Sequence, residues 1–394
     1  MITRDLGDTA SQRFRHYPVV TITGPRQSGK TTLSRMTFPD LPYVSLEAPD
    51  HRRRALEDPR SFLADYAAGA ILDEIQRAPE LPSYLQVLCD ERHRNGQFVL
   101  TGSHNLTLLP RLSQSLAGRT ALLYLLPPAW NELQRFGNAP TRLDDALFTG
   151  AYPRIFDQRM DAGSWLGDYV TTYVERDVRQ VLNVFDLVAF RTFLGLLAGR
   201  TGQLLNLQSL GADAGVDAKT VRAWIGVLET SFLVFRLPPF FRNIRKRLVR
   251  TPKLFFVDTG LLCHLLGIRS AADLRTHPAR GAVFENWVAS EALKARFHRG
   301  LGENLFFYRD RSGHEVDLLL VSANRITAVE AKAGATLGSD FVDGLKWFES
   351  LAANRFPEDR VETLLVYGGE QPAEMRGTTI LPWCAIDQFD WAAA

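Results

Sequence analysis

The chain has 394 residues, more than one hydrophobic core usually spans, so we expect two or three domains. Hydrophobic residues make up 45% of it and charged residues 23%, which is the ordinary composition of folded globular proteins and excludes a disordered chain. The formal net charge is only +2, which excludes a strong overall attraction to polyanions, so any contact with nucleic acid must be local.

The cysteines and the hydropathy pattern indicate the cellular compartment. Cys89, Cys263 and Cys384 lie far apart and show no metal-ligand spacing, which argues against a zinc site or a disulfide framework. Residues 1–8 are polar and acidic where a signal peptide would be apolar, and no apolar run approaches the roughly 20 residues that a bilayer requires. We therefore expect a cytoplasmic protein with no membrane contact.

The first motif is a glycine-rich loop. It matches the phosphate-binding pattern G-x-x-x-x-G-K-[ST], follows a β-branched run at residues 19–23 that suits a buried strand, and precedes a helical stretch. The backbone N–H groups of such a loop point at an anion, its lysine supplies charge for the β- and γ-phosphates, and its hydroxyl can ligate Mg²⁺. The sequence therefore predicts an ATP site with Mg²⁺, in which Lys30 is catalytic and Thr31 is a metal ligand, made of Gly24, Pro25, Arg26, Gln27, Ser28, Gly29, Lys30, Thr31 and Thr32.

An acidic pair ends a later apolar strand. Residues 69–76 read Gly-Ala-Ile-Leu-Asp-Glu-Ile-Gln, so the strand closes with Asp73 and Glu74. In an NTPase the first acid holds Mg²⁺, and the second accepts a proton from the attacking water. Downstream of a complete phosphate loop, the pair predicts a hydrolysing site with Asp73 as metal ligand and Glu74 as catalytic base.

Two further segments of this region carry candidates with alternatives. A helix predicted over residues 81–90 leads to a strand at 97–100, and Ser103 or Thr101 at its tip is the expected γ-phosphate sensor; a simple turn is the alternative. Arginines 52–54 indicate a solvated helix face, with a partner-binding surface as the alternative.

Four segments of the chain carry a family resemblance. They are the phosphate loop, Leu-Asp-Glu-Ile-Gln-Arg-Ala-Pro-Glu-Leu at 72–81, Leu-Thr-Gly-Ser at 100–103 and Ser-Leu-Ala-Gly-Arg at 115–119. Taken together, they resemble a family of prokaryotic AAA+ ATPases. The resemblance covers nearly the whole chain and includes a C-terminal domain of uncharacterised function. It implies a five-stranded parallel sheet with helices on both faces, and self-association into a ring such as a hexamer. One subunit's arginine completes its neighbour's site in such rings, and Arg119 is the position expected to do so. An arginine that caps a helix C-terminus is the alternative.

The segment after the ATPase core is predicted to be a helical lid or linker. Pro127 and Pro128 end the strand at residues 121–126. One long amphipathic helix is predicted over residues 168–183. Its charged residues are expected to pair at i,i+4 spacing on a wet face, and Arg176 or Arg179 as a lid sensor of the nucleotide is the alternative.

A helix-turn-helix followed by a basic hairpin is predicted next. Helices at 207–214 and 218–228, the second capped by Asp217, precede strands at 232–237 and 253–257. This is the order of a winged helix, and it predicts DNA binding through phosphate contacts. A winged helix used for protein contacts or as a lid is the alternative. The expected DNA-binding residues are Lys219, Arg222, Arg242, Arg245, Lys246, Arg247 and Arg250.

The last segment carries three acids and a lysine on neighbouring predicted elements. An amphipathic helix at 284–293 carries Glu285, a strand carries Asp317, and the next strand carries Glu330 and Lys332 in Glu-x-Lys spacing. Together these four residues resemble the core of PD-(D/E)xK nucleases. Asp317 and Glu330 could share Mg²⁺, Lys332 faces the same side and could activate water, and Glu285 could complete the metal shell. A hairpin whose polar face carries these charges is the alternative, and Glu-Val-Asp stands where the motif has Pro-Asp. A final strand is expected to open at residues 381–383.

We therefore predict an α/β protein with four parts: an AAA+ P-loop ATPase core with a parallel sheet at 1–127, a helical lid at 128–200, a winged helix at 201–258 and an α/β nuclease-like domain at 259–394. The expected function is Mg²⁺-dependent ATP hydrolysis coupled to action on DNA, as a motor or remodeller. A nucleotide-switched DNA nuclease in genome defence and a protein-binding ATPase without nucleic acid are the alternatives.

Overall fold

The computed structural model describes residues 1–103, 115–174, 186–241, 251–322 and 324–392. The chain folds into two compact units. The first comprises Met1–Pro128, Thr230–Phe232 and Phe297–Leu301, and the second comprises Ala129–Glu229, Leu233–Arg296 and Gly302–Ala394. The division of the second unit into a lid, a winged helix and a nuclease-like domain stays a prediction.

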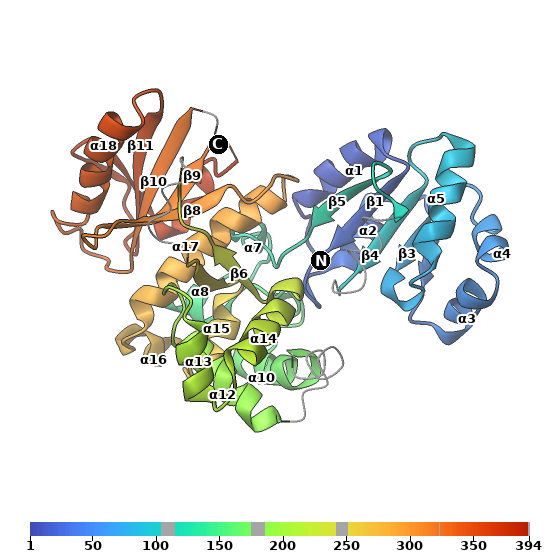
Figure 1. The fold of residues 1–394 in the computed structure, drawn as a ribbon, viewed down its shortest axis with the longest axis horizontal. Coiled ribbons are helices and arrows are strands. Elements are labelled where there is room, and N and C mark those ends of the chain that lie inside the picture. Colours follow the sequence, from blue (N-terminus) through green and yellow to red (C-terminus); the bar gives the residue numbers. More distant parts are fainter. Residues whose placement is uncertain (104–114, 175–185, 242–250, 323, 393–394) are drawn as a thin grey trace. The chain divides into compact units, whose positions relative to one another are not determined.

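The first unit alternates strands and helices along the chain (Figure 1). Its elements are α1 (Leu6–His16), β1 (Val19–Thr23), α2 (Lys30–Thr37), β2 (Tyr43–Ser45), α3 (Pro49–Glu57), α4 (Pro59–Ala64), β3 (Ala70–Asp73), the 3₁₀ helix η1 (Ile75–Arg77), α5 (Leu81–Arg92), β4 (Phe98–Gly102) and β5 (Thr120–Tyr124).

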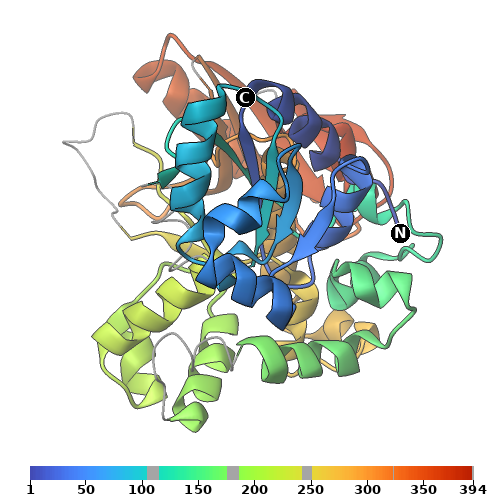
Figure 2. The ribbon, with the colours of Figure 1, turned by 90° about the vertical axis from the view of Figure 1, so that its right-hand side faces the viewer.

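A five-stranded parallel sheet in the order β2-β3-β4-β1-β5 forms the centre of this unit. All five residues of the interior strand β1 are buried, as expected for a parallel sheet covered on both faces. Successive residues of β1 belong to the hydrophobic cores on opposite faces of the sheet. Val19 belongs to the core that contains Phe62 and Leu85, whereas Val20 belongs to the core that contains Leu6 and Leu33. The prediction of a five-stranded parallel sheet between two layers of helices is confirmed (Figure 2).

The second unit begins with helices and ends with a sheet. Its elements are α7 (Trp130–Leu133), α8 (Leu143–Thr149), α9 (Pro153–Asp157), α10 (Ala162–Tyr169), the π-helix η2 (Val170–Val174), α12 (Leu187–Ala198), α13 (Leu207–Ala214), α14 (Ala218–Thr230), β6 (Val234–Leu237), β7 (Lys253–Phe256), α15 (Thr259–Leu265), α16 (Ala271–Thr276), α17 (Arg280–Phe297), β8 (Leu305–Arg309), β9 (Glu315–Val321), β10 (Arg325–Lys332), α18 (Asp343–Arg355), β11 (Arg360–Tyr367), β12 (Ala373–Met375), β13 (Thr378–Pro382) and the 3₁₀ helix η4 (Trp383–Gln388).

The sheet of the second unit is mixed. Its six strands have the order β12-β13-β11-β10-β9-β8, with β10-β11 and β11-β13 parallel and the other pairs antiparallel. Helix α18 packs on it through Leu345, Phe348 and Ala352, which share a core with Leu319 and Leu365. Strands β6 and β7 form a separate antiparallel pair.

Three expectations about elements were wrong or only partly met. The strand expected to open at residues 381–383 is instead the end of β13, and η4 begins at Trp383. Helix α17 is not amphipathic: Asn286, Ser290 and Lys294 are buried together with its apolar residues, because neighbouring elements cover it on most sides. The long helix expected over 168–183 continues α10 as a π-helix to Val174, and residues 175–183 lie outside the described part.

Candidate nucleotide site and carboxylate cluster

The phosphate loop joins β1 to α2 through a backbone that needs glycine. Gly24 has φ +152°, and a Cβ at this position would lie 2.0 Å from the carbonyl oxygen of Leu125, so the loop packs directly on the chain that follows β5. Gly29 has φ +95° and immediately precedes α2, whose first residue is Lys30. The strand, loop and helix predicted for an anion site are therefore present.

Lys30 folds back over the loop. Its Nζ donates hydrogen bonds to the carbonyl oxygens of Gly24, at 3.0 Å, and Pro25, at 2.7 Å. Burial lowers the pKa of this ammonium to about 8, although the charges of Glu74 and Asp73 oppose the shift. A phosphate would bring negative charge to the group and favour its protonated form.

Asp73, at the end of β3, accepts hydrogen bonds from hydroxyl groups of three other elements. Thr31 Oγ1 lies 3.0 and 3.1 Å from the two carboxylate oxygens, the Tyr43 hydroxyl donates to Oδ2 at 2.7 Å, and Thr101 Oγ1 donates to Oδ1. Burial, followed by the hydrogen bond to Asp73, raises the pKa of Tyr43 to about 12. The expected pair of metal ligands, Thr31 and Asp73, is thus brought together, and Tyr43 joins it.

Thr31 and Asp73 fit Mg²⁺ because both offer hard oxygen atoms at the mouth of the phosphate loop. These two residues would hold the ion, which supplies positive charge to the phosphates when bound.

Glu74 has left-handed backbone dihedrals, φ +58° and ψ +48°, which turn the chain sharply after β3. Its carboxylate accepts hydrogen bonds from Gln76 and from Ser103 Oγ, the latter at 3.2 Å. The two candidate γ-phosphate sensors therefore have different partners. Thr101 contacts the expected metal ligand, Asp73, and Ser103 contacts the expected base, Glu74.

Arg4 is a residue of the site that no sequence motif indicated. It precedes α1 and is 8% exposed, and its guanidinium donates to the carbonyl oxygens of Ser28, at 2.9 Å, and Leu126, at 2.8 Å. It thereby ties the phosphate loop to the segment after β5. A lone arginine twenty residues before the loop carries no local pattern, so only the fold could reveal it.

Arg119 lies at the end of the sheet where the strands β1 and β5 begin. It immediately precedes β5, and its carbonyl accepts from the N–H of Val19 at the start of β1. Its guanidinium forms a two-bonded ion pair with Asp90 of α5, at 2.5 and 2.8 Å. The phosphate loop follows the opposite end of β1, so Arg119 lies away from the nucleotide site of its own chain.

The predicted helix-turn-helix corresponds to α13 and α14. Gly215 ends α13 with φ +72°, and Asp217 Oδ1 accepts from the N–H of Thr220 at 2.6 Å, as expected for the N-cap of α14. Lys219 and Arg222 are exposed on α14. The remaining expected DNA contacts, Arg242, Arg245, Lys246, Arg247 and Arg250, lie outside the described residues.

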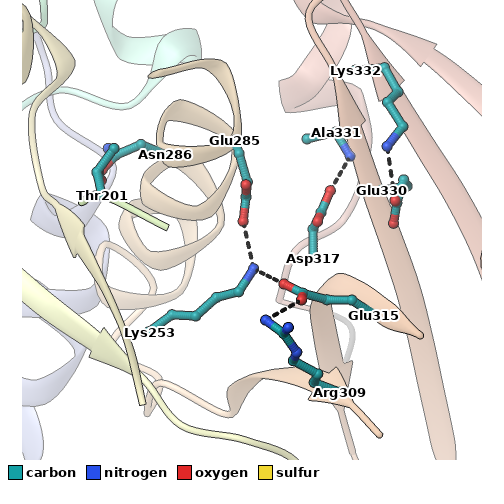
Figure 3. Close-up of polar contacts among 10 residues, drawn as sticks. All are labelled: Thr201, Lys253, Glu285, Asn286, Arg309, Glu315, Asp317, Glu330, Ala331 and Lys332. Carbon is teal, nitrogen blue, oxygen red and sulfur yellow. Dashed lines mark hydrogen bonds and ion pairs between the residues drawn. The ribbon is translucent and has the colours of Figure 1, made fainter. Parts of the chain in front are cut away.

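The four predicted nuclease residues lie in one region of the second unit, on α17, β9 and β10 (Figure 3). Glu285 pairs with Lys253 at 2.9 Å, Asp317 Oδ2 accepts from the N–H of Ala331 at 3.0 Å, and Lys332 donates to Glu330 Oε1 at 3.0 Å. We call the four carboxylates Glu285, Glu315, Asp317 and Glu330 the carboxylate cluster.

Lys253 and Glu315 are members of this region that the sequence patterns missed. Lys253 Nζ lies 2.5 Å from Glu315 Oε1 as well as 2.9 Å from Glu285 Oε1. Burial and then the Asp317 charge raise the pKa of Glu285 to about 8, and the same two causes raise that of Glu330 to about 7. Burial alone would lower the pKa of Lys253, but the charges of Glu285, Asp317 and Glu315 outweigh it and raise the pKa.

The carboxylate cluster as arranged does not form a metal site. Within the part of the chain that the structure describes, no three Asp, Glu, His or Cys side chains converge closely enough to hold a metal ion. Glu285, Asp317 and Glu330 each bind a different partner instead. The described helices also include none that is both long and apolar enough to cross a membrane.

Comparison with known proteins finds three family models along the chain. A model described as an AAA domain matches residues 16–134, and models of two domains of unknown function, DUF8612 and DUF4143, match residues 140–272 and 280–386. Two relatives, the uncharacterized proteins Rv2008c of Mycobacterium tuberculosis and Mb2031c of Mycobacterium bovis, are each 33% identical over 338 residues. The match covers 84% of this chain and 74% of each relative.

Several solved structures are also similar in part. The Walker-type ATPase paby2304 of Pyrococcus abyssi has a TM-score of 0.44 and 13% identity and matches 66% of this chain and 94% of its own. DnaA from Aquifex aeolicus bound to AMPPCP has a TM-score of 0.32 and 15% identity, with 57% and 86% covered. A single-residue variant of RuvB from Thermotoga maritima has a TM-score of 0.29 and 20% identity, with 59% and 86% covered.

The phosphate loop, the parallel sheet and the matched AAA domain define the first unit as an AAA+ P-loop ATPase domain. Its site brings together the lysine, the threonine and the two acids that the sequence predicts for ATP hydrolysis. The chain as a whole belongs to the family of the mycobacterial proteins Rv2008c and Mb2031c.

Proposed function

We propose that this protein hydrolyses ATP with Mg²⁺ and couples the hydrolysis to action on DNA, as a motor or remodeller. The observation that carries the ATPase part is the group formed by Lys30, Thr31 and Asp73, with Glu74 next to it. Lys30 positions the phosphates, Thr31 and Asp73 hold the ion, and Glu74 accepts the proton of the attacking water.

The support for DNA as the partner lies in the second unit. Helices α13 and α14 are followed by the antiparallel strands β6 and β7, which is the element order of a winged helix. Lys219 and Arg222 are exposed on α14, and five basic residues at 242–250 lie between the two strands in the sequence. Cations on such elements bind backbone phosphates without reading the base sequence.

We also propose that the active form is a ring of several subunits, because Arg119 lies at the edge of the sheet opposite to its own phosphate loop. The arginine would then complete the site of the neighbouring subunit.

Steady-state ATP hydrolysis, measured with and without single-stranded, duplex and branched DNA, tests the main proposal. We expect DNA to stimulate turnover, Lys30→Ala to abolish nucleotide binding or turnover, and Glu74→Gln to bind ATP without turning it over.

The double variant Lys219→Ala with Arg222→Ala should lose the stimulation by DNA at unchanged basal turnover. The control Arg269→Ala, at an exposed position of the same unit, should keep the stimulation. Normal hydrolysis by both site variants would refute the ATPase roles, and the absence of salt-sensitive DNA binding would refute the partner.

A nucleotide-switched nuclease is a second candidate, favoured by the proximity of Glu285, Asp317, Glu330 and Lys332 in the second unit. Mg²⁺-dependent cleavage of DNA that Asp317→Ala and Lys332→Ala both remove would support it. DNA that stays intact under all nucleotide conditions would exclude it.

A further inference from the structure

Lys253 is a buried cation that contacts two members of the carboxylate cluster, Glu285 and Glu315 (Figure 3). It is the first residue of β7 and is only 2% exposed. Its ammonium lies between Glu285 of α17 and Glu315 of β9, at 2.9 and 2.5 Å, and 5.5 Å from the ring centre of Phe307. Removing an ammonium from water costs several kcal/mol, so this position is stable only because carboxylates surround it.

The carboxylates of the cluster are themselves stabilised by a nearby positive charge. The negative charges of Glu285, Glu315 and Asp317 all stabilise the ammonium of Lys253. Carboxylates this close repel one another unless a positive charge lies between them. Glu330, 9% exposed, leaves its Oε2 atom buried without a hydrogen-bond partner. The region therefore offers an unused buried oxygen in addition to those that already contact a cation.

The oxygen atoms that surround Lys253 are those that a hard divalent cation prefers. Mg²⁺ or Mn²⁺ binds carboxylate oxygens at roughly 2.0–2.2 Å, whereas the two oxygens here lie at hydrogen-bond distances of 2.5 and 2.9 Å from nitrogen. The ammonium between Glu285 and Glu315 occupies the space that a metal shared by these two carboxylates would need. Asp317 and Glu330, the other two predicted ligands, bind the N–H of Ala331 and the ammonium of Lys332 instead.

The backbone that carries Lys253 is firmly attached. The Asn286 side chain accepts from the N–H of Phe256 and donates to its carbonyl oxygen, both at 2.7 Å, and it also accepts from Thr201 at 2.7 Å. The N–H of Gly202 donates to the carbonyl of Leu254 at 2.9 Å. Strand β7 is thus fixed against α17, so the backbone of Lys253 stays beside Glu285 and only its side chain can move.

We propose that the Lys253 ammonium occupies the position of a divalent cation in the carboxylate cluster, so that Mg²⁺ or Mn²⁺ binds there only when this lysine is removed or withdrawn. The inference uses the cluster of the second proposed function but does not require cleavage. It assigns to Lys253 the role of a cation supplied by the chain itself.

Mn²⁺ binding to the full-length protein, followed by electron paramagnetic resonance, tests this. Every variant carries Asp73→Asn, which removes the expected ion site of the ATPase domain. We expect Lys253→Met to bind one Mn²⁺ at least tenfold more tightly than the parent, and Lys346→Met, which removes a lysine paired with Glu349 on α18, to bind as the parent does. Adding Asp317→Asn to Lys253→Met should abolish the gain.

A folded Lys253→Met protein without the added site, or a gain that persists with Asp317→Asn, would overturn the inference. Should Lys253→Met melt below the assay temperature, its melting curve decides: stabilisation by Mn²⁺ but not by the same concentration of Na⁺ supports the inference, and no stabilisation refutes it. DNA cleavage is scored separately. Mn²⁺ binding without cleavage rejects only the nuclease candidate, whereas the absence of binding rejects the role of Lys253.

Discussion

At the scale of single residues, the ATP site depends on side chains that hold other groups in place. Asp73 accepts hydrogen bonds from Thr31, Tyr43 and Thr101, three residues that come from three different elements. Arg4 similarly fixes the phosphate loop by binding its carbonyl groups. Such residues do not react themselves, but they set the distances on which catalysis depends.

Arg4→Met should raise the apparent KM for ATP about tenfold, equivalent to about 1.4 kcal/mol, and change kcat less. The reason is that the buried carbonyls of Ser28 and Leu126 lose their donor, so the loop no longer holds one conformation. Steady-state kinetics give the two constants. Arg4→Lys should recover part of the affinity, because a lysine can replace one of the two hydrogen bonds.

Arg15→Met is the matched control, since Arg15 is exposed at the end of α1. A KM for Arg4→Met equal to that of this control would show that the loop keeps its shape without Arg4.

At the scale of elements, α17 determines how the second unit is held together. It carries Glu285 towards Lys253 and Asn286 towards β7, and Asn286 is completely buried. The amide of Asn286 pairs with both backbone groups of Phe256, as a neighbouring strand would. A single side chain therefore satisfies polar groups that would otherwise be buried without partners.

Asn286→Leu should lower the free energy of unfolding by about 2–4 kcal/mol, because two buried backbone groups and Thr201 lose their partners. Urea denaturation followed by circular dichroism measures the change. The control is Asn354→Leu on the exposed face of α18, for which we expect less than about 0.5 kcal/mol. Equal effects of the two substitutions would contradict the role of Asn286.

At the scale of the whole molecule, Arg119 bears on assembly. It is bound to Asp90 at the edge of the sheet from which β1 starts, whereas Lys30 follows the other end of β1. If subunits form a ring, the arginine of one and the phosphate loop of the next meet between them.

Arg119→Ala should therefore reduce ATP turnover by at least about a hundredfold, as expected for an arginine finger in trans. Mixing it with Lys30→Ala should restore part of the activity, because some mixed sites then combine an intact loop with an intact arginine. Asp90→Ala removes the ion pair but keeps the arginine, and it should retain turnover. Two inactive variants that stay inactive on mixing would refute the shared site.

The sequence by itself determined the class of the first unit. Gly24 to Thr31, and Asp73 with Glu74, are local patterns at the ends of two strands of one parallel sheet: the loop follows β1, and the acids stand at the end of β3 and directly after it. The N-cap role of Asp217 was also predictable, because this short acidic residue directly precedes the helical stretch that it caps. The helix at 284–293 was placed correctly but judged amphipathic, because its buried polar residues look solvent-exposed until their partners are known.

Only the tertiary structure decided which distant groups meet. Arg4 reaches Leu126, 122 positions later, and Lys253 reaches Glu285, 32 positions later, through contacts that no periodicity encodes. The carboxylate cluster illustrates the difference most clearly. The spacing of Glu330 and Lys332 predicted a metal centre, but a lysine from a separate strand lies among the carboxylates. Charge must be balanced in three dimensions, so the partner of a buried carboxylate is set by the fold and not by its neighbours in the chain.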